Sequence, residues 1–144
     1  MKDNNISLFA VSFRQGFVSP NVPIATFYQK EKALNFVLDS GSDANVIDEK
    51  VVGLLEHVKK EPDATSCNKL NGVGGSKDVS ICTLSFNTEE EKYTEDFLVA
   101  DMSEAFNPIK KDHCIVIHGI LGSGFLTKHN AILDFKNLSA YSKQ

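Results

Sequence analysis

The sequence has little that would carry it into a membrane or onto nucleic acid. No apolar run approaches the ~20 residues that a membrane-spanning helix needs, and residues 1–5 lack the sustained apolar stretch of a signal peptide. The 15 basic side chains are outnumbered by 19 acidic ones, for a net charge of −4, so we expect no basic surface for phosphate groups. These absences predict a cytoplasmic protein with no nucleic-acid partner and no membrane partner.

Cysteine is also scarce. The chain has three, Cys67, Cys82 and Cys114, and no CxxC pair. An odd number without such spacing fits a reducing compartment better than a disulfide framework. One alternative stays open: if a hairpin turns between Gly74 and Gly75, Cys67 and Cys82 lie opposite each other and could form a disulfide, provided that its demanding geometry is met.

Several common catalytic and ligand-binding motifs are missing. The sequence has no GxSxG nucleophile elbow, and the glycine-rich residues 72–77 lack the GxxxxGK[ST] spacing of a phosphate loop. His113, Cys114 and His118 are of the types that bind metals, but on a strand Cys114 and His118 would lie about 13 Å apart, too far for one ion. We therefore expect no metal and no cofactor.

The length and the hydrophobicity pattern predict one mainly β domain. With 144 residues and 42% hydrophobic content, the chain can bury the core of a single domain, expected to span residues 1–144. Apolar spacing predicts helices at 48–59 and 123–129, and Pro108 favours a loop over 102–112. Strands are predicted at residues 6–13, 23–28, 33–38, 65–70, 79–86, 93–99, 114–117, 131–135 and 138–141. This pattern is typical of a barrel-like domain.

The chain is organised around an aspartate that follows an apolar run. Residues 36–38 are apolar, Asp39, Ser40 and Gly41 come next, and residues 46–47 resume the apolar pattern. A carboxylate at the end of a buried strand is costly unless something binds it, and a glycine lets the chain turn so that N–H groups face the carboxylate. The triplet also occurs in ordinary turns. In this context it resembles the Asp-Ser/Thr-Gly-Ser/Ala signature of aspartic proteases.

Two further segments extend the resemblance. The sequence Asn-Gly-Val-Gly-Gly at residues 71–75 resembles the flap tip of retroviral proteases. Residues 120–122, Ile-Leu-Gly, followed by apolar residues at 125–126 and 132–135, resemble the second signature of these enzymes. The chain is therefore similar to retropepsin-like aspartic proteases over residues 35–135. This resemblance implies a mainly β, closed barrel-like retropepsin fold with a flap hairpin and about two short helices, assembled as a homodimer.

The resemblance implies a specific chemistry. An aspartic protease needs two carboxylates, one that acts as a general base on a water and one that acts as an acid on the scissile carbonyl. This chain has one Asp-Ser-Gly triplet, so the second carboxylate must come from Asp39 of a second copy across a two-fold axis. The implied function is an aspartic endopeptidase acting on a polypeptide. The alternative is a catalytically inactive retropepsin-like module for dimerisation or peptide binding, and a more distant one is a β-rich interaction domain.

By resemblance, the catalytic residues are Asp39, Ser40 and Gly41, with the Ser40 hydroxyl bonding across the two-fold axis. The main chain of the substrate is expected to contact Asp43, and the segment at 120–122 to pack beneath the catalytic loop and line an apolar pocket. The expected substrate-binding residues are Ser42, Asp43, Ala44, Asn71, Gly72, Val73, Gly74, Gly75, Ile120, Leu121 and Gly122.

Two positions bear on the electrostatics of this site. Many retroviral enzymes have an arginine directly after the glycine of the second signature, and it pairs with the aspartate that corresponds to Asp43. In this chain that position is Ser123, and the one arginine is Arg14. The partner of Asp43 therefore stays open. Ser42 is expected to donate a hydrogen bond to the Asp39 carboxylate, which predicts an acidic activity optimum.

Overall fold

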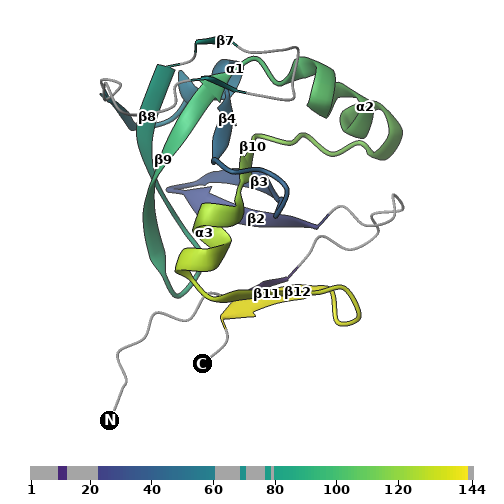
Figure 1. Cartoon of the computed structure of the whole chain (residues 1–144). Helices are drawn as coiled ribbons and strands as arrows, with labels where there is room; N and C mark the ends of the chain where they lie inside the picture. Colours follow the sequence, from purple (N-terminus) through teal and green to yellow (C-terminus); the bar gives the residue numbers. More distant parts are fainter. Residues whose placement is uncertain (1–9, 13–22, 61–68, 71–76, 79, 143–144) are drawn as a thin grey trace.

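The computed structural model describes residues 10–12, 23–60, 69–70, 77–78 and 80–142. Within them the chain is mainly β, as predicted, and no helix is long and apolar enough to cross a membrane. The strands are β1 (Ala10–Ser12), β2 (Ile24–Gln29), β3 (Lys32–Leu38), β4 (Val46–Asp48), β5 (His57–Lys60), β6 (Lys69–Leu70), β7 (Lys77–Asp78), β8 (Ser80–Asn87), β9 (Lys92–Ala100), β10 (Gly119–Leu121), β11 (Ala131–Asp134) and β12 (Ser139–Ser142). The helices are α1 (Glu49–Val52), α2 (Ser103–His113) and α3 (Ser123–Lys128) (Figure 1).

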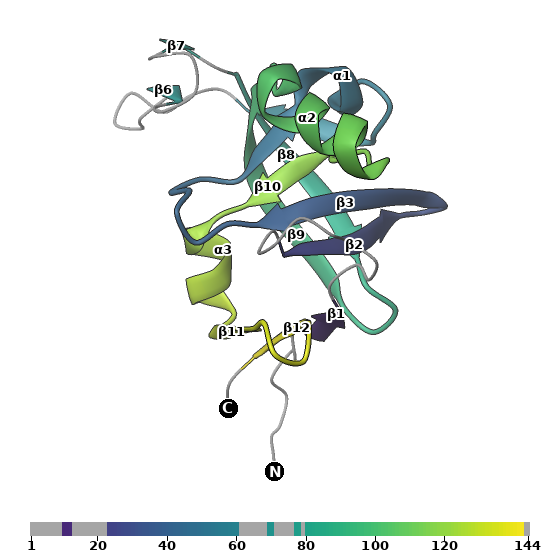
Figure 2. The ribbon, with the colours of Figure 1, turned by 90° about the vertical axis from the view of Figure 1, so that its right-hand side faces the viewer.

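The main sheet closes on itself. Its strand order is β2-β3-β10-β4-β9-β8-β5, and β8 also pairs with β2 through Tyr28 and Asn87. The six strands from β2 to β8 therefore form a closed barrel, and β5 extends it beyond β8. Figure 2 shows β10 lying beside β3, and in the strand order β4 follows on the other side of β10. This confirms the closed barrel-like fold class predicted from the sequence.

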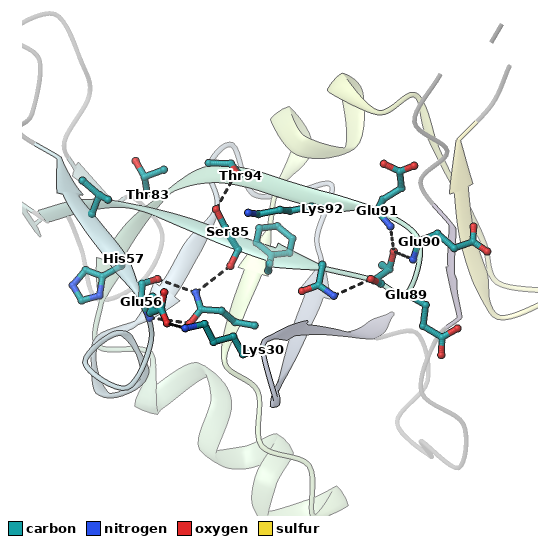
Figure 3. Close-up of a pocket in the computed structure, with 15 residues that line it drawn as sticks. Lys30, Glu56, His57, Thr83, Ser85, Glu89, Glu90, Glu91, Lys92 and Thr94 are labelled. Atoms are coloured by element: carbon teal, nitrogen blue, oxygen red, sulfur yellow. Dashed lines mark hydrogen bonds and ion pairs between the residues drawn. The ribbon is translucent and has the colours of Figure 1, made fainter. Parts of the chain in front are cut away.

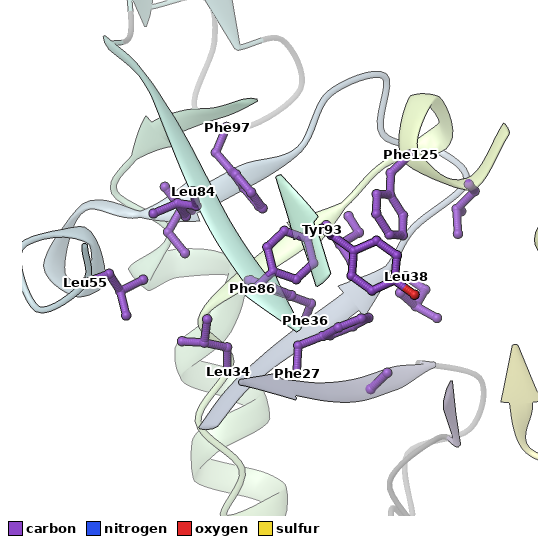
Figure 4. Packing of buried hydrophobic residues seen from close by; sticks show 14 of the residues in the cluster. Phe27, Leu34, Phe36, Leu38, Leu55, Leu84, Phe86, Tyr93, Phe97 and Phe125 are labelled. Atoms are coloured by element: carbon purple, nitrogen blue, oxygen red, sulfur yellow. The ribbon is translucent and has the colours of Figure 1, made fainter. Parts of the chain in front are cut away.

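The barrel interior is filled by aromatic rings. Along β3 buried residues alternate with partly exposed ones, as expected for a strand with one face on the core. Four phenylalanines from four strands are at most 1% exposed, and they meet in tilted or edge-on contacts such as the Phe27–Phe86 pair, with ring centroids 5.3 Å apart (Figure 4). Full burial of one such side chain contributes roughly 1.5–3 kcal/mol. This core makes the barrel a firm support for the loop that follows β3.

A second apolar cluster lies on the outer face of the barrel and positions α2. Phe106 and Met102 pack there with Val46 of β4 and with the partly buried Ile120 of β10. The prediction of a loop over residues 102–112 is wrong, because spacing of four and seven residues from Met102 places three apolar side chains on one helical face despite Pro108. The helix is anchored at its start by the buried Asp48 carboxylate, which accepts a hydrogen bond from the Met102 N–H (3.3 Å).

Two other predicted elements differ from the structure. The helix predicted at 48–59 ends at Val52, and residues 57–60 form β5, which pairs antiparallel with β8. The local apolar spacing favoured a helix, but pairing with the distant strand β8 makes these residues a strand instead. The strand predicted at 114–117 has no ladder partner among the described residues. Ile115 and Ile117 are instead buried in the cluster under α2.

The chain ends form a separate small sheet. Strands β1, β12 and β11 pair antiparallel in that order, and Figure 1 shows them at the end of the molecule opposite α1. Three large apolar side chains remain exposed on the β11–β12 hairpin: Phe135 is 49% exposed, Leu138 43% and Tyr141 39%. Their exposure makes this hairpin a candidate contact surface.

Substitution of Gly119 tests the packing of β10 against its neighbours. A Cβ atom at Gly119 would lie 2.5 Å from the Val46 carbonyl oxygen and 3.0 Å from the Phe36 ring. We expect Gly119→Ala to lower the free energy of unfolding by about 1–3 kcal/mol in urea denaturation, because backbone must move. Gly53→Ala is the matched control, since nothing lies within 4 Å of its Cβ position. Equal stability of the two variants would contradict the close approach of Gly119 to Val46 and Phe36.

Candidate active site

Asp39 follows directly from the end of β3. Leu38 is paired in parallel with Leu121 of β10, and the Asp39 N–H donates to the Leu121 carbonyl oxygen (2.9 Å). The main-chain N–H of Asp39 is therefore bound by a neighbouring strand. The side chain is partly exposed, and Ser40 and Gly41 after it are exposed.

A tight turn orients the carboxylate. The Gly41 N–H donates to Asp39 Oδ1 (2.9 Å), and the Ser42 N–H donates to the Asp39 carbonyl oxygen (3.1 Å). A Cβ atom at Gly41 would lie 3.2 Å from the same Oδ1 atom. A residue with a side chain would therefore crowd the carboxylate oxygen that the turn holds. One carboxylate oxygen is therefore bound by main chain, in a local bond that ordinary Asx turns also make.

The loop of residues 39–45 rests on the segment between β10 and α3. The Ser123 N–H donates to the Ser42 carbonyl oxygen (2.7 Å). At Gly122 a Cβ atom would lie 2.5 Å from the Ser42 carbonyl oxygen and 2.6 Å from that of Ala44. Only glycine allows this approach, which explains the residue type in the Ile-Leu-Gly motif.

Asn45 completes this contact and was missed in the sequence. Its Oδ1 accepts a hydrogen bond from the Gly122 N–H (2.9 Å), and its Nδ2 donates to the Asp96 carbonyl oxygen (3.2 Å). One side chain thus joins the loop, the β10–α3 connection and β9. The available signal was a polar residue directly before the apolar pair Val46-Ile47. Its two partners are 51 and 77 residues away in sequence, so no local pattern reveals them.

The structure brings most of the predicted site residues together. Asp39, Ser40, Gly41, Ser42, Asp43 and Ala44 form one loop, and Ile120, Leu121 and Gly122 lie beside it. Leu121 is 0% exposed in the barrel core, whereas Ile120 is partly buried on the opposite face. Asn71, Gly72, Val73, Gly74 and Gly75, the predicted flap, lie outside the described residues, as does Cys67.

The predicted hydrogen bond from Ser42 to Asp39 is wrong. The Ser42 hydroxyl donates to the Ala44 carbonyl oxygen (2.7 Å). A hydroxyl carries one proton, so this bond leaves none for the Asp39 carboxylate. Ser42 therefore stabilises the loop, and the acidic optimum predicted from its donation to Asp39 loses that support.

Asp43 is exposed and borders a groove of about 410 Å³. The groove also contains the ion pair between Lys60 Nζ and Asp96 Oδ2 (2.6 Å). A larger groove of about 810 Å³ lies along the β8–β9 hairpin and contains none of the candidate catalytic residues (Figure 3). Among the described residues no cluster of three or more His, Cys, Asp or Glu side chains could hold a metal ion. Of these two grooves, the one beside Asp43 is adjacent to the candidate loop.

Replacement of Asn45 tests its role in holding the loop. Asn45→Ala removes the acceptor of the Gly122 N–H and the donor to Asp96. We expect the free energy of unfolding to fall by about 1–3 kcal/mol, because partly buried main-chain groups lose their partners. Asn107→Ala, at an exposed position on α2, is the control, and thermal or urea denaturation measures both. If Asn45→Ala lowers the free energy of unfolding no more than Asn107→Ala does, the Asn45 side chain does not hold the loop.

The comparisons with known proteins bear on the fold. No protein-family model matches the sequence, and no curated protein matches it. Among solved structures, EIAV protease complexed with the inhibitor HBY-793 is similar, with 18% identity, 83% of this chain and 98% of that chain covered, and a TM-score of 0.54. The retroviral protease-like domain of Ddi1 from Leishmania major matches with 12% identity, 83% and 91% covered, and a TM-score of 0.47. The chain has the retropepsin-like fold, that of a retroviral protease.

Proposed function

We propose that the chain is an aspartic endopeptidase that works as a two-fold homodimer. The observation that carries the proposal is the position of Asp39: the carboxylate of an Asp-Ser-Gly turn, at the end of β3 in a retropepsin-like fold. The partial exposure of this side chain keeps it within reach of a substrate. We also propose that residues 1–144 act as a single domain.

In the proposed reaction the two Asp39 side chains share one proton across the two-fold axis. The ionised carboxylate takes a proton from a water, which attacks the peptide carbonyl, while the protonated one donates a hydrogen bond to the carbonyl oxygen. The Gly41 N–H, 2.9 Å from Asp39 Oδ1, fixes the orientation of each carboxylate. The exposed Ser40 hydroxyl is proposed to bond to the loop of the other subunit.

Substrate binding is proposed for residues on both sides of the catalytic loop. Ser42, Asp43 and Ala44 continue from the catalytic turn, and Asp43 faces the adjoining groove. Ile120 would line an apolar pocket, whereas Leu121 and Gly122 act beneath the loop, which agrees with their burial. Residues 71–75 are proposed to close over the substrate, as glycine-rich lids do in other enzymes.

Two features support the homodimer. Each chain provides one Asp-Ser-Gly triplet, and the reaction needs two carboxylates. The exposed Phe135, Leu138 and Tyr141 on the β11–β12 hairpin supply apolar surface. Terminal strands from two subunits would bury these side chains and add to the contact made by the loop at Asp39.

The peptidase proposal is tested with Asp39→Asn. An amide cannot serve as general base, so we expect cleavage of a denatured protein or a peptide library to fall by at least about 10²-fold. Glu104→Gln, an exposed carboxylate on α2, controls for loss of charge, and circular dichroism verifies that each variant folds. Equal activity of Asp39→Asn and wild type would refute the mechanism. A wild type that binds peptides and dimerises but never cleaves them would favour the inactive module.

The interface proposal is tested with Leu138→Asp. Leu138 has a φ of 54°, a conformation that aspartate tolerates well, so the variant should fold. We expect sedimentation velocity to show at least a tenfold weaker dimer (about 1.4 kcal/mol), because a charge would be buried at the contact, and activity should fall on dilution. Leu54→Asp, 67% exposed in wild type, is the control. A monomeric wild type that still cleaves would contradict the dimer, and an unaffected Leu138→Asp dimer would place the interface elsewhere.

A further inference from the structure

His118, which lies just before β10, is bonded to two other strands, β3 and β4. Its main-chain N–H donates to the Asn35 carbonyl oxygen (2.9 Å), and its carbonyl oxygen accepts from the Asp48 N–H (3.0 Å). Its ring contributes a third bond, because Nδ1 accepts from the Asn35 N–H (2.9 Å). The Asn35 side chain is fixed as well, since it donates to the Val116 carbonyl oxygen (2.9 Å). The imidazole is thus part of the main-chain hydrogen-bonding pattern of the barrel.

The ring nitrogen extends the parallel ladder between β3 and β10. That ladder pairs Gly119 with Phe36 and continues to the Asp39 N–H, which donates to the Leu121 carbonyl oxygen (2.9 Å). One end of the β3 segment at residues 35–39 is therefore bound by the His118 ring and the other by Leu121. A shift of β10 against β3 at His118 would move the acceptor of Asp39 and the Gly122 contact with the loop.

We propose that His118 is a positioning residue for the loop that carries Asp39, and that it acts only while its ring is neutral. The proposal rests on the proposed peptidase function for its effect on activity, but the hydrogen bond it invokes is independent of that function. The His118 ring would then be a titrating group, besides the carboxylates of the proposed reaction, on which the position of the loop depends.

The chemistry of the ring explains the requirement. A neutral imidazole has one N–H and one acceptor nitrogen, so an accepting Nδ1 places the proton on Nε2. Protonation adds a proton to Nδ1, which then faces the Asn35 N–H, donor against donor. The bond between the ring and β3 is lost, and a partly buried N–H group is left without its acceptor.

The charged groups around the ring act in opposite directions. Burial lowers the pKa of His118, and the Asp48 carboxylate on β4 acts to raise it. Lys50 of α1 has its Nζ 3.5 Å from Asp48 Oδ1, and it also pairs with Asp101 before α2. The neighbour on β3 is the uncharged Asn35. Burial prevails, so the pKa is lowered and the ring stays neutral at neutral pH.

The sign of the linkage follows from the lowered pKa. The unfolded chain binds a proton at His118 more readily than the folded chain does. The contribution of the neutral His118 ring to the free energy of unfolding is therefore complete above the unfolded pKa of ~6.5. It is lost as the pH falls from that value toward the folded pKa. In the folded chain the ring is protonated as the pH falls through its lowered pKa, which breaks the bond to Asn35 and removes one support of the loop at Asp39.

The first arm of the test measures pH–rate profiles on one soluble peptide. For wild type we expect an acid limb in which kcat falls about tenfold per pH unit, as for one inhibitory proton. In His118→Asn the amide Oδ1 can accept a hydrogen bond from the Asn35 N–H, and it does not titrate. When each profile is normalised to its own rate at neutral pH, the acid limb of His118→Asn should therefore lie at least about one pH unit below that of wild type. His118→Leu, without an acceptor, should have a lower plateau than His118→Asn. His57→Asn, an exposed histidine, should keep the wild-type limb.

The second arm needs neither activity nor a variant. In wild type, the protection of the Asn35 amide, corrected for the intrinsic slowing of amide exchange in acid, should fall in step with the NMR titration of the His118 ring. The amides of β8 and β9, measured as reference, should keep their protection. A chain with no activity at any pH would refute the peptidase proposal and leave this arm to decide. Asn35 protection that ignores the ring titration, or identical acid limbs in wild type and His118→Asn, would overturn the positioning role.

Discussion

The candidate site depends on the contact between the loop of residues 39–45 and the segment at 121–123. The hydrogen bonds across it run from Asp39 to Leu121, from Ser123 to Ser42 and from Gly122 to Asn45. They require the two chains to approach so closely that a Cβ atom at Gly122 would meet a carbonyl oxygen at 2.5 Å. The strands beneath are fixed by the aromatic core, so the carboxylate is positioned by the rigid barrel rather than by a free loop.

The outer cluster supports the same strands from the other side. Helix α2 packs on residues of β3, β4 and β10, and the Asp48 carboxylate binds its first turn. Each of these three strands therefore has one face on the aromatic core and the other under α2. A strand that is packed on both faces cannot shift its register without exposing one of them, so the position of Asp39 relative to β10 is fixed twice.

An element could be predicted from the sequence where neighbouring residues determine it, and not where a partner distant in sequence does. Strands β2, β3, β8 and β9 follow from short-range alternation and turn signals, and the Asp-Ser-Gly turn is a local motif. Residues 57–60 could not be predicted as a strand, because their partner in β8 is distant and their own spacing favours a helix. Helix α2 was missed because Pro108 outweighed a weak apolar spacing. Asn45 had no local signal, since its role exists only after Gly122 and Asp96 are folded beside it.

The same distinction applies to the electrostatics of the site. Sequence proximity suggested that Ser42 bonds to Asp39, but its hydroxyl is used by Ala44, two residues further on. His118 is 79 positions from Asp39, yet its ring lies in the hydrogen-bond ladder that ends at the Asp39 N–H. A group that supports the proposed catalytic residue through the main chain changes the surroundings of that residue without touching it. In this fold, therefore, the protonation state of a residue in the barrel wall bears on the geometry of a carboxylate at its edge. In the proposed dimer, an acidic medium suits two carboxylates that share a proton, but it acts against the strand pairing that we propose His118 supports.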